Sequence, residues 1–133
     1  MAITPEQQNN IQQVVSSLPG LKLVYLFGSR AREQSDSQSD WDIAILTESP
    51  VNSTKCWELA QEIALKLDAD VDLIDLTKAS TVFRLQIVSD GILLYGKEYD
   101  ADVFAMQTYS MYGNLQQDRQ DIVEDFVKEL RNE

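Results

Sequence analysis

The chain of 133 residues contains no histidine and a single cysteine, Cys56. The lack of histidine excludes Ser-His-Asp triads, Cys-His dyads and His-ligated zinc sites, so any chemistry must use carboxylates, hydroxyls, lysine, arginine or a bound metal. A single cysteine excludes an internal disulfide. No window approaches the roughly 18 apolar residues of a membrane span, and the first ten residues lack the apolar core of a signal peptide. We therefore expect a cytoplasmic protein with no membrane partner.

Basic residues are also scarce. Eleven lysines and arginines stand against 22 aspartates and glutamates, which gives a formal net charge of −11. A strongly acidic surface repels a phosphate backbone, so we expect no direct nucleic-acid partner. The charge is compatible with a basic protein partner, and equally with a role in solubility alone.

The residue pattern alternates short helices and strands, and the length fits one domain, residues 1–133. Thr4 followed by Pro5 and, three residues after Thr4, a glutamine predicts the start of a first helix. The order of elements predicts an α/β (α+β) fold, in which helices pack on a small mixed β-sheet. Gly113 and Asn114 mark a candidate break in the last helical segment. Strands are expected at 21–27, 40–47, 71–76 and 92–95, and further helices from Ser53 or Thr54, over 77–89 and over about 98–131.

The most informative pattern is Gly28-Ser29, ten residues, and then Asp40-Trp41-Asp42. An apolar strand ends in a Gly-Ser turn, whose backbone N–H groups and hydroxyl can approach a phosphate closely. Side chains alternate along a strand, so Asp40 and Asp42 project from one face, while Trp41 points to the opposite face and into the core. Neighbouring carboxylates repel each other, and a divalent cation is the usual reason for such a pair. The pattern predicts Mg²⁺-dependent chemistry at a nucleotide phosphate.

This pattern, G-S-x10-D-x-D, resembles the nucleotidyltransferase superfamily, which includes DNA polymerase beta and kanamycin nucleotidyltransferase. The sequences LFGSRAR at 26–32 and VDLIDL at 71–76 are similar to those of the minimal nucleotidyltransferases. These are the MntA-type antitoxins that are paired with HEPN-domain toxins of the HepT type. The resemblance covers roughly residues 5–96. It implies a polymerase beta-like palm fold for that core, followed by C-terminal helices.

A third carboxylate is expected on a neighbouring strand, because a two-metal site needs a further ligand that can orient or deprotonate the attacking hydroxyl. Asp68 falls at a helix end, and Asp75 faces away from Asp72. Asp70 and Asp72 share a face, but only Asp72 lies within the apolar strand, where an unpaired carboxylate is costly. The third aspartate of the family sits in a V-D-L/V-V/I stretch, which matches residues 71–74. We therefore choose Asp72, and we expect Asp70 and Asp75 to be solvated.

The resemblance implies a role for each residue of the motif. Gly28 and Ser29 would hold the β- and γ-phosphates of ATP. Asp40 and Asp42 would bind Mg²⁺, and Asp72 would complete the site for a second ion. An acceptor hydroxyl would then attack the α-phosphorus in line, and pyrophosphate would leave.

Three arginines are candidates for contact with the triphosphate. Arg30 and Arg32 follow the phosphate turn directly, where a guanidinium could neutralise the γ-phosphate or the departing pyrophosphate. Both could equally be solvated loop residues. Arg84, on the helix expected after the third strand, is a weaker candidate.

We expect no second domain that could hold a small acceptor, and this expectation favours a protein acceptor with a binding surface of its own. The resemblance implies a type VII-like antitoxin that transfers AMP from ATP to a tyrosine hydroxyl of a cognate HEPN ribonuclease toxin and so neutralises it. Two alternatives stay open. One is a small-molecule nucleotidyltransferase that acts as a homodimer on an antibiotic-type acceptor. The other is a non-catalytic antitoxin that acts by binding alone, although a pure binding module has no use for three aligned carboxylates.

Overall fold

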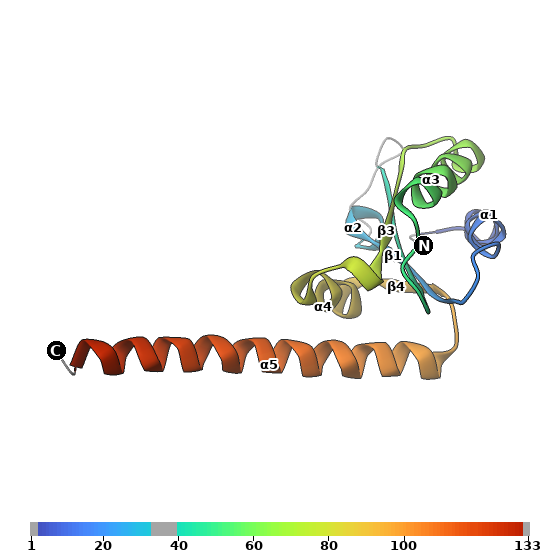
Figure 1. Ribbon diagram of the computed structural model, residues 1–133. Coiled ribbons are helices and arrows are strands. Elements are labelled where there is room, and N and C mark those ends of the chain that lie inside the picture. The colour runs from blue at the N-terminus through green and yellow to red at the C-terminus, as the bar shows by residue number, and fades with distance from the viewer. Residues whose placement is uncertain (1–2, 33–39, 132–133) are drawn as a thin grey trace.

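The structure is a computed structural model, and it describes residues 3–32 and 40–131. Its elements follow the predicted alternation of helices and strands (Figure 1). No helix within these two ranges is both long and apolar enough to cross a bilayer. The elements are α1 (Pro5–Val15), β1 (Leu21–Phe27), α2 (Gly28–Ala31), β2 (Trp41–Thr47), α3 (Ser53–Leu67), β3 (Val71–Asp75), the 3₁₀ turn η1 (Leu76–Lys78), α4 (Thr81–Asp90), β4 (Ile92–Tyr95) and α5 (Glu98–Arg131).

The strands of the described ranges form one four-stranded sheet in the order β3-β2-β1-β4. β1 is antiparallel to both of its neighbours, β2 and β4. β2 and β3 run parallel, and α3 supplies the crossover that a parallel pair requires. The sheet is therefore mixed, as predicted. β3 and β4 form its two edges.

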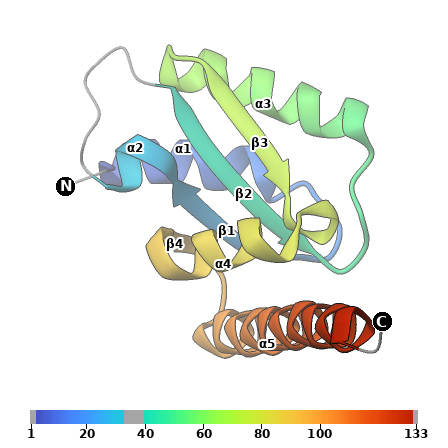
Figure 2. The same ribbon diagram turned by 90° about the vertical axis from the view of Figure 1, so that its left-hand side faces the viewer.

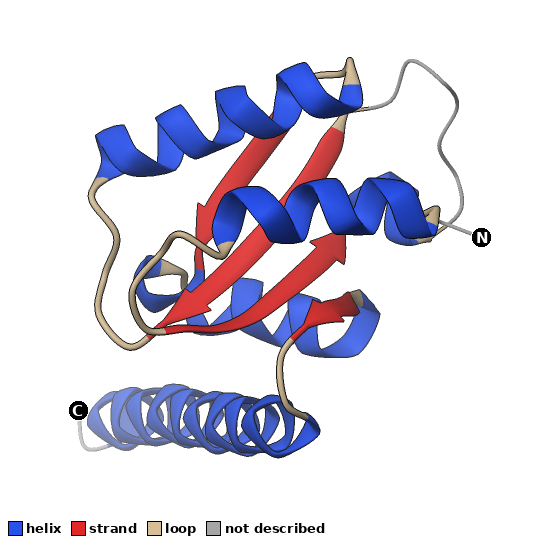
Figure 3. Cartoon of the chain, turned by 90° about the vertical axis from the view of Figure 1, so that its right-hand side faces the viewer, coloured by secondary structure: helices blue, strands red, loops and turns tan. Residues whose placement is uncertain are grey.

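Helices cover both faces of this sheet. α1 and α3 lie on one face, and α4 and the first part of α5 lie on the other (Figures 1 and 3). Alternation along β2 sends Trp41 and Ile43 into the core beneath α1 and α3. Ala44 and Leu46 belong to the core beneath α4 and α5. Asp42 alternates with Trp41 and Ile43, so it projects from the α4 side of the sheet.

The first helix begins where its capping sequence predicts. The backbone N–H of Thr4 donates to Gln7 Oε1 at 2.9 Å, and the backbone N–H of Gln7 donates to Thr4 Oγ1 at 3.1 Å. This is a reciprocal capping box, with Pro5 in the first helical turn. Ile11 and Val15 are fully buried against the sheet, so both capping and burial hold α1 in place.

Two predictions about helices need correction. The helix expected over 77–89 is divided into η1 and α4, because Ser80 starts a new helix by accepting the backbone N–H of Phe83 at 3.1 Å. The candidate break at 113–114 is wrong, since α5 continues without interruption to Arg131. A glycine inside a helix costs only about 1 kcal/mol relative to alanine. That cost does not end a helix when good helix formers follow.

One aromatic side chain of α3 also departs from its expected packing. The apolar spacing of this segment places Trp57 in the buried stripe, together with Ala60 and Ile63. Ala60 and Ile63 are buried, but Trp57 is 65% exposed. Trp57 stands beside the edge strand β3, where no further strand covers it. The neighbouring Cys56 is also expected to be buried, as a small residue of this helix, but it is half-buried.

Candidate active site

The Gly-Ser turn lies at the point where β1 ends and α2 begins. Gly28 adopts a backbone φ of +75°, a region that L-residues other than glycine rarely occupy. A Cβ atom at this position would collide with Oδ2 of Asp42 and would lie 3.1 Å from its Cγ. The turn therefore needs glycine both for its backbone conformation and for the space that the neighbouring carboxylate occupies. Ser29 follows, half-buried, as the second residue of α2.

Strand register brings the motif and the third carboxylate together. Phe27, the last residue of β1, is paired with Asp42 on β2. Asp42 is in turn paired with Asp72 on β3. Directly paired residues of neighbouring strands project from the same face, so Asp42 and Asp72 are neighbours on the α4 side of the sheet. Asp40 is exposed and lies two residues before Asp42.

The charges around Asp42 act on one another. Burial raises the pKa of the Asp42 carboxyl, and the negative charges of Asp72 and Asp40 raise that pKa further. The positive charge of Arg32 opposes them and lowers it. The ionised form of Asp42 is therefore disfavoured within this acidic group. Such repulsion is the condition that a bound cation relieves.

The described residues fit a divalent cation in their chemistry. Three carboxylates supply hard oxygen ligands of the kind that Mg²⁺ prefers. As they stand, however, no three His, Cys, Asp or Glu side chains in the described ranges are gathered closely enough to hold a metal ion. Metal binding would therefore require the carboxylates of Asp40, Asp42 and Asp72 to turn toward a common point.

The candidate arginines occupy different surroundings. The Arg30 guanidinium lies over the Trp41 ring, 4.2 Å from the ring centroid, at a distance typical of a cation–π contact. Arg32 is exposed and acts electrostatically on Asp42. Arg84 donates to the Thr77 carbonyl at 3.1 Å, so it ties α4 to η1. Residues 33–39, between the turn and Asp40, lie outside the described residues.

Asp75 is not solvated, and this prediction was wrong. It is 8% exposed, and its Oδ2 accepts the backbone N–H of Val51 at 2.8 Å. Its Oδ1 accepts the backbone N–H of Thr77 at 3.0 Å and the Thr77 hydroxyl at 2.7 Å. Lys78 Nζ donates to the Val51 carbonyl at 2.6 Å. Asp75 faces away from Asp72, as expected, but it connects the loop before α3 to η1 instead of facing water.

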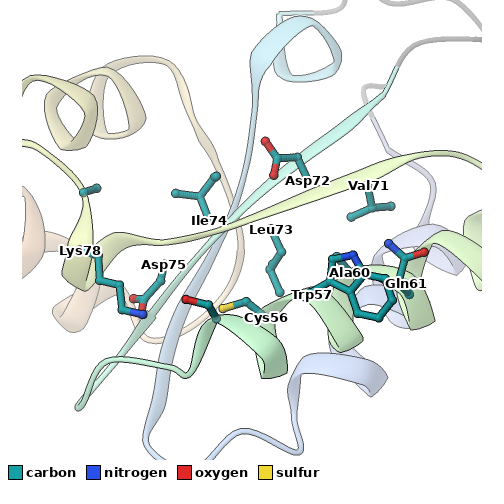
Figure 4. A pocket seen from close by; sticks show the side chains of 12 residues that line it. Cys56, Trp57, Ala60, Gln61, Val71, Asp72, Leu73, Ile74, Asp75 and Lys78 are labelled. Carbon is teal, nitrogen blue, oxygen red and sulfur yellow. The ribbon is translucent and has the colours of Figure 1, made fainter.

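A cleft of about 420 Å³ runs along the free edge of β3, between this strand and α3. Cys56 and Trp57 of α3 line it from one side, and Lys78 lines it near η1. Asp72 also borders the cleft, but its carboxylate points away from the α3 residues (Figure 4). The carboxylate of Asp72 thus faces away from the cleft, and neither Gly28 nor Asp42 lines it, so the cleft lies apart from the phosphate turn.

Most of the chain matches a known protein family. Residues 9–100 match the family Polymerase beta, Nucleotidyltransferase, and the chain belongs to this nucleotidyltransferase family. Within the family it is similar to the protein adenylyltransferase MntA of Shewanella oneidensis. The two are 43% identical over 125 residues, which cover 91% of this chain and 90% of the relative.

Solved toxin–antitoxin structures contain chains of the same fold. A chain from a toxin–antitoxin crystal structure with AMP-PNP matches with a TM-score of 0.80 and 43% identity, covering 90% of this chain and 98% of that chain. A chain from the complex of the tri-AMPylated Shewanella oneidensis HEPN toxin with MNT antitoxin matches with a TM-score of 0.75 and 42% identity, covering 91% and 96% of the two chains. These matches confirm the predicted polymerase beta-like fold.

Proposed function

We propose that this chain is an antitoxin that transfers AMP from ATP to a tyrosine hydroxyl of a HEPN-type toxin, and so neutralises the toxin in the cytoplasm. The observation that carries the proposal is the strand register that sets Gly28, Asp42 and Asp72 side by side at one end of the sheet. The match to an adenylyltransferase of 43% identity supports the activity. The matches to toxin–antitoxin complexes support the class of partner.

The phosphate turn has the properties that a triphosphate requires. Without a side chain, Gly28 lets backbone N–H groups approach the β- and γ-phosphates closely. Ser29 adds an N–H and a hydroxyl. Arg30 and Arg32 supply positive charge next to the turn, where the pyrophosphate departs. The Arg30 guanidinium lies over the Trp41 ring, on the face of β2 opposite to Asp42, so Arg30 would have to turn toward the carboxylate face to contact the phosphates.

The carboxylates divide the remaining work. Asp40 and Asp42 would hold Mg²⁺, and Asp72 would complete the site for a second ion. When bound, the metal neutralises the charge that develops on the triphosphate. Asp72 is paired directly with Asp42 and stands on the edge strand β3, so it would be the residue that orients the acceptor hydroxyl and accepts its proton. The hydroxyl oxygen forms a new bond to the α-phosphorus, the bond to the bridging oxygen breaks, and pyrophosphate leaves.

The acceptor is a protein because the described residues offer little to hold a small one. The cleft along β3 is open and borders only one of the three carboxylates. A protein acceptor brings its own binding surface and needs only to present one hydroxyl near Asp72. The solved relatives include a complex in which a HEPN toxin is tri-AMPylated, and we extend that class of acceptor to this chain.

The test uses ATP labelled at the α-phosphate, Mg²⁺ and a purified HEPN-domain protein from the same genome. We expect label on the HEPN protein with the wild-type chain, and none with the Asp40→Ala/Asp42→Ala variant. Label on a small molecule alone would favour the small-molecule nucleotidyltransferase. If the Asp40→Ala/Asp42→Ala variant transfers no label but still neutralises the toxin, the result would favour an antitoxin that acts by binding alone.

A further inference from the structure

The C-terminal part of α5 has no cover in the described structure. Every residue from 116 to 131, here called the free segment, is exposed. It extends beyond α4 and away from the rest of the chain (Figure 1). Several of its exposed side chains are large and apolar, and Ile122 and Phe126 are 68% and 61% exposed. We call these side chains the apolar stripe: Ile122, Val123, Phe126, Val127 and Leu130.

The apolar stripe prolongs the buried face of α5. Ile122 lies 18 residues after Phe104, and Phe126 lies 18 residues after Thr108. Eighteen residues make five full turns at about 3.6 residues per turn, so each pair faces the same way. Phe104 and Thr108 are both buried in the interior of the domain. The side of α5 that packs on its own domain thus continues, unpartnered, along the free segment.

The free segment also projects on the side of the sheet that carries the candidate active site. Asp42 shares a face with Ala44, which packs in the core beneath α4 and α5. Figures 1 and 2 show α2 and α4 on this side of the sheet. They also show α5 running past α4 and away from the sheet on the same side. A protein bound to the apolar stripe would therefore lie on the same side of the sheet as the carboxylates of Asp42 and Asp72.

Charge indicates the chemistry of the partner. Asp118, Asp125 and Glu129 lie three or four positions from Ile122 or Phe126, so they border one edge of the apolar stripe. A second copy of this chain would bring a further net charge of −11 and the same acidic border. A surface that combines an apolar groove with lysine or arginine at its rim complements the free segment instead.

We propose that the apolar stripe is the docking surface for the protein acceptor, which it holds through an apolar groove rimmed with basic residues so that the acceptor hydroxyl faces Asp72. This inference rests on the proposed function, since the HEPN-type toxin is that acceptor. Docking on α5 supplies the binding energy that the open site lacks. It explains why a helix continues well beyond the domain that it packs on.

The test compares two double variants of the full chain. Ile122→Ala/Phe126→Ala removes apolar area from the stripe, and the control Glu124→Ala/Lys128→Ala removes one charge of each sign from the opposite side of the same helix. All four residues are already exposed and alanine favours helix, so both variants fold. Calorimetry without nucleotide measures the affinity for a purified HEPN-domain protein from the same genome. ATP affinity and sedimentation of the chain alone are measured in parallel.

We expect the stripe variant to lose about tenfold or more in affinity for the HEPN protein, and to keep its ATP affinity, while the control binds as the wild type does. In the transfer assay the loss appears in KM for the protein acceptor. Equal affinities for all three chains would overturn the inference, as would a wild-type dimer that the stripe variant abolishes. A wild-type chain that binds the HEPN protein tightly but transfers no AMP would refute the proposed function and leave the docking surface standing.

Discussion

The Cα atom of Gly28 faces the carboxylate of Asp42 so closely that no Cβ atom fits between them. Gly28 directly follows β1, the strand that pairs with β2, and its φ of +75° turns the chain into α2 at that point. Two features of the candidate site, the phosphate turn and the central carboxylate, therefore share one small space. A change in either residue displaces the other.

We expect Gly28→Ala to lower AMP transfer by about 100-fold or more, because displacement of reacting groups by about 1 Å has effects of that size. The fold loses about 1–2 kcal/mol from the unfavourable φ. The matched control is Gly113→Ala, since a Cβ at Gly113 meets nothing within 4 Å. It should keep full activity and gain up to about 1 kcal/mol of helix stability. Labelled ATP and urea denaturation give both quantities, and equal activity of the two variants would exclude the crowding at Gly28 as a constraint.

Asp42→Asn should abolish transfer and yet stabilise the metal-free protein. Burial and the charges of Asp72 and Asp40 raise the pKa of Asp42, so its ionised form is disfavoured in the folded state. A carboxyl whose folded pKa is raised weakens the fold as the pH rises from about 4 through that raised value. In EDTA at pH 7 we therefore expect the variant to melt at a higher temperature than the wild type.

Addition of Mg²⁺ with a non-hydrolysable ATP analogue reverses this order. The wild type gains stability from the bound ligand, whereas the Asn variant gains less because it has lost an ionised ligand. A Tm that responds equally to Mg²⁺ in both proteins would argue against Asp42 as a metal ligand. The Asp90→Asn variant, changed at an exposed residue of α4, controls for the loss of one charge.

The relative placement of the candidate site residues could be predicted from the sequence, because it follows from strand periodicity. Residues two apart on a strand share a face, so the sequence indicates that Asp40 and Asp42 lie side by side. The apolar run around Asp72 indicates a further strand. The register that pairs Asp42 with Asp72 is a tertiary property. Both aspartates are the second residues of their strands, so a parallel pairing of β2 with β3 that aligns the strand starts brings them together.

What the sequence hid depends on contacts between distant segments. The sequence around Asp75 gives no sign that its side chain is buried. Its carboxylate meets the backbone N–H of Val51 only in the folded chain. By its spacing, Trp57 belongs to the buried face of α3. In the folded chain it lies beside β3, which is an edge strand, so no further strand covers it. Gly113 is a weak helix former, and the uninterrupted α5 shows that its flanking residues outweigh it.

The choice of Asp72 over Asp70 gives a third prediction. Both are exposed and share a face by alternation, but Asp70 precedes β3, and its backbone carbonyl accepts the N–H of Trp41 at 2.9 Å. We expect Asp72→Asn to lower kcat by about 10²- to 10⁴-fold through loss of a proton acceptor and ligand. Asp70→Asn, which leaves the backbone contact intact, should retain activity within about twofold. If the losses were reversed, the third carboxylate would be Asp70.

Asp75 gives a prediction about stability alone. Its carboxylate accepts three hydrogen bonds from Val51 and Thr77, and Asp75→Ala leaves the buried N–H of Val51 without that acceptor. We expect a loss of about 2–3 kcal/mol in the free energy of unfolding, measured by urea denaturation. Asp75→Asn keeps one acceptor oxygen and should fall between the alanine variant and the wild type. Glu62→Ala, at an exposed position of α3, should change stability by less than about 0.5 kcal/mol.

Because Asp75 points away from the face that carries Asp72, the folded fraction of the Asp75 variants should transfer AMP at the wild-type rate. Activity is therefore compared at a temperature well below each Tm, with kcat corrected for the folded fraction measured by circular dichroism. A kcat that falls in step with the Asp72 variant, while stability stays unchanged, would move Asp75 from the scaffold into the active site. The three hydrogen bonds to the loop and η1 are the reason to expect the opposite result.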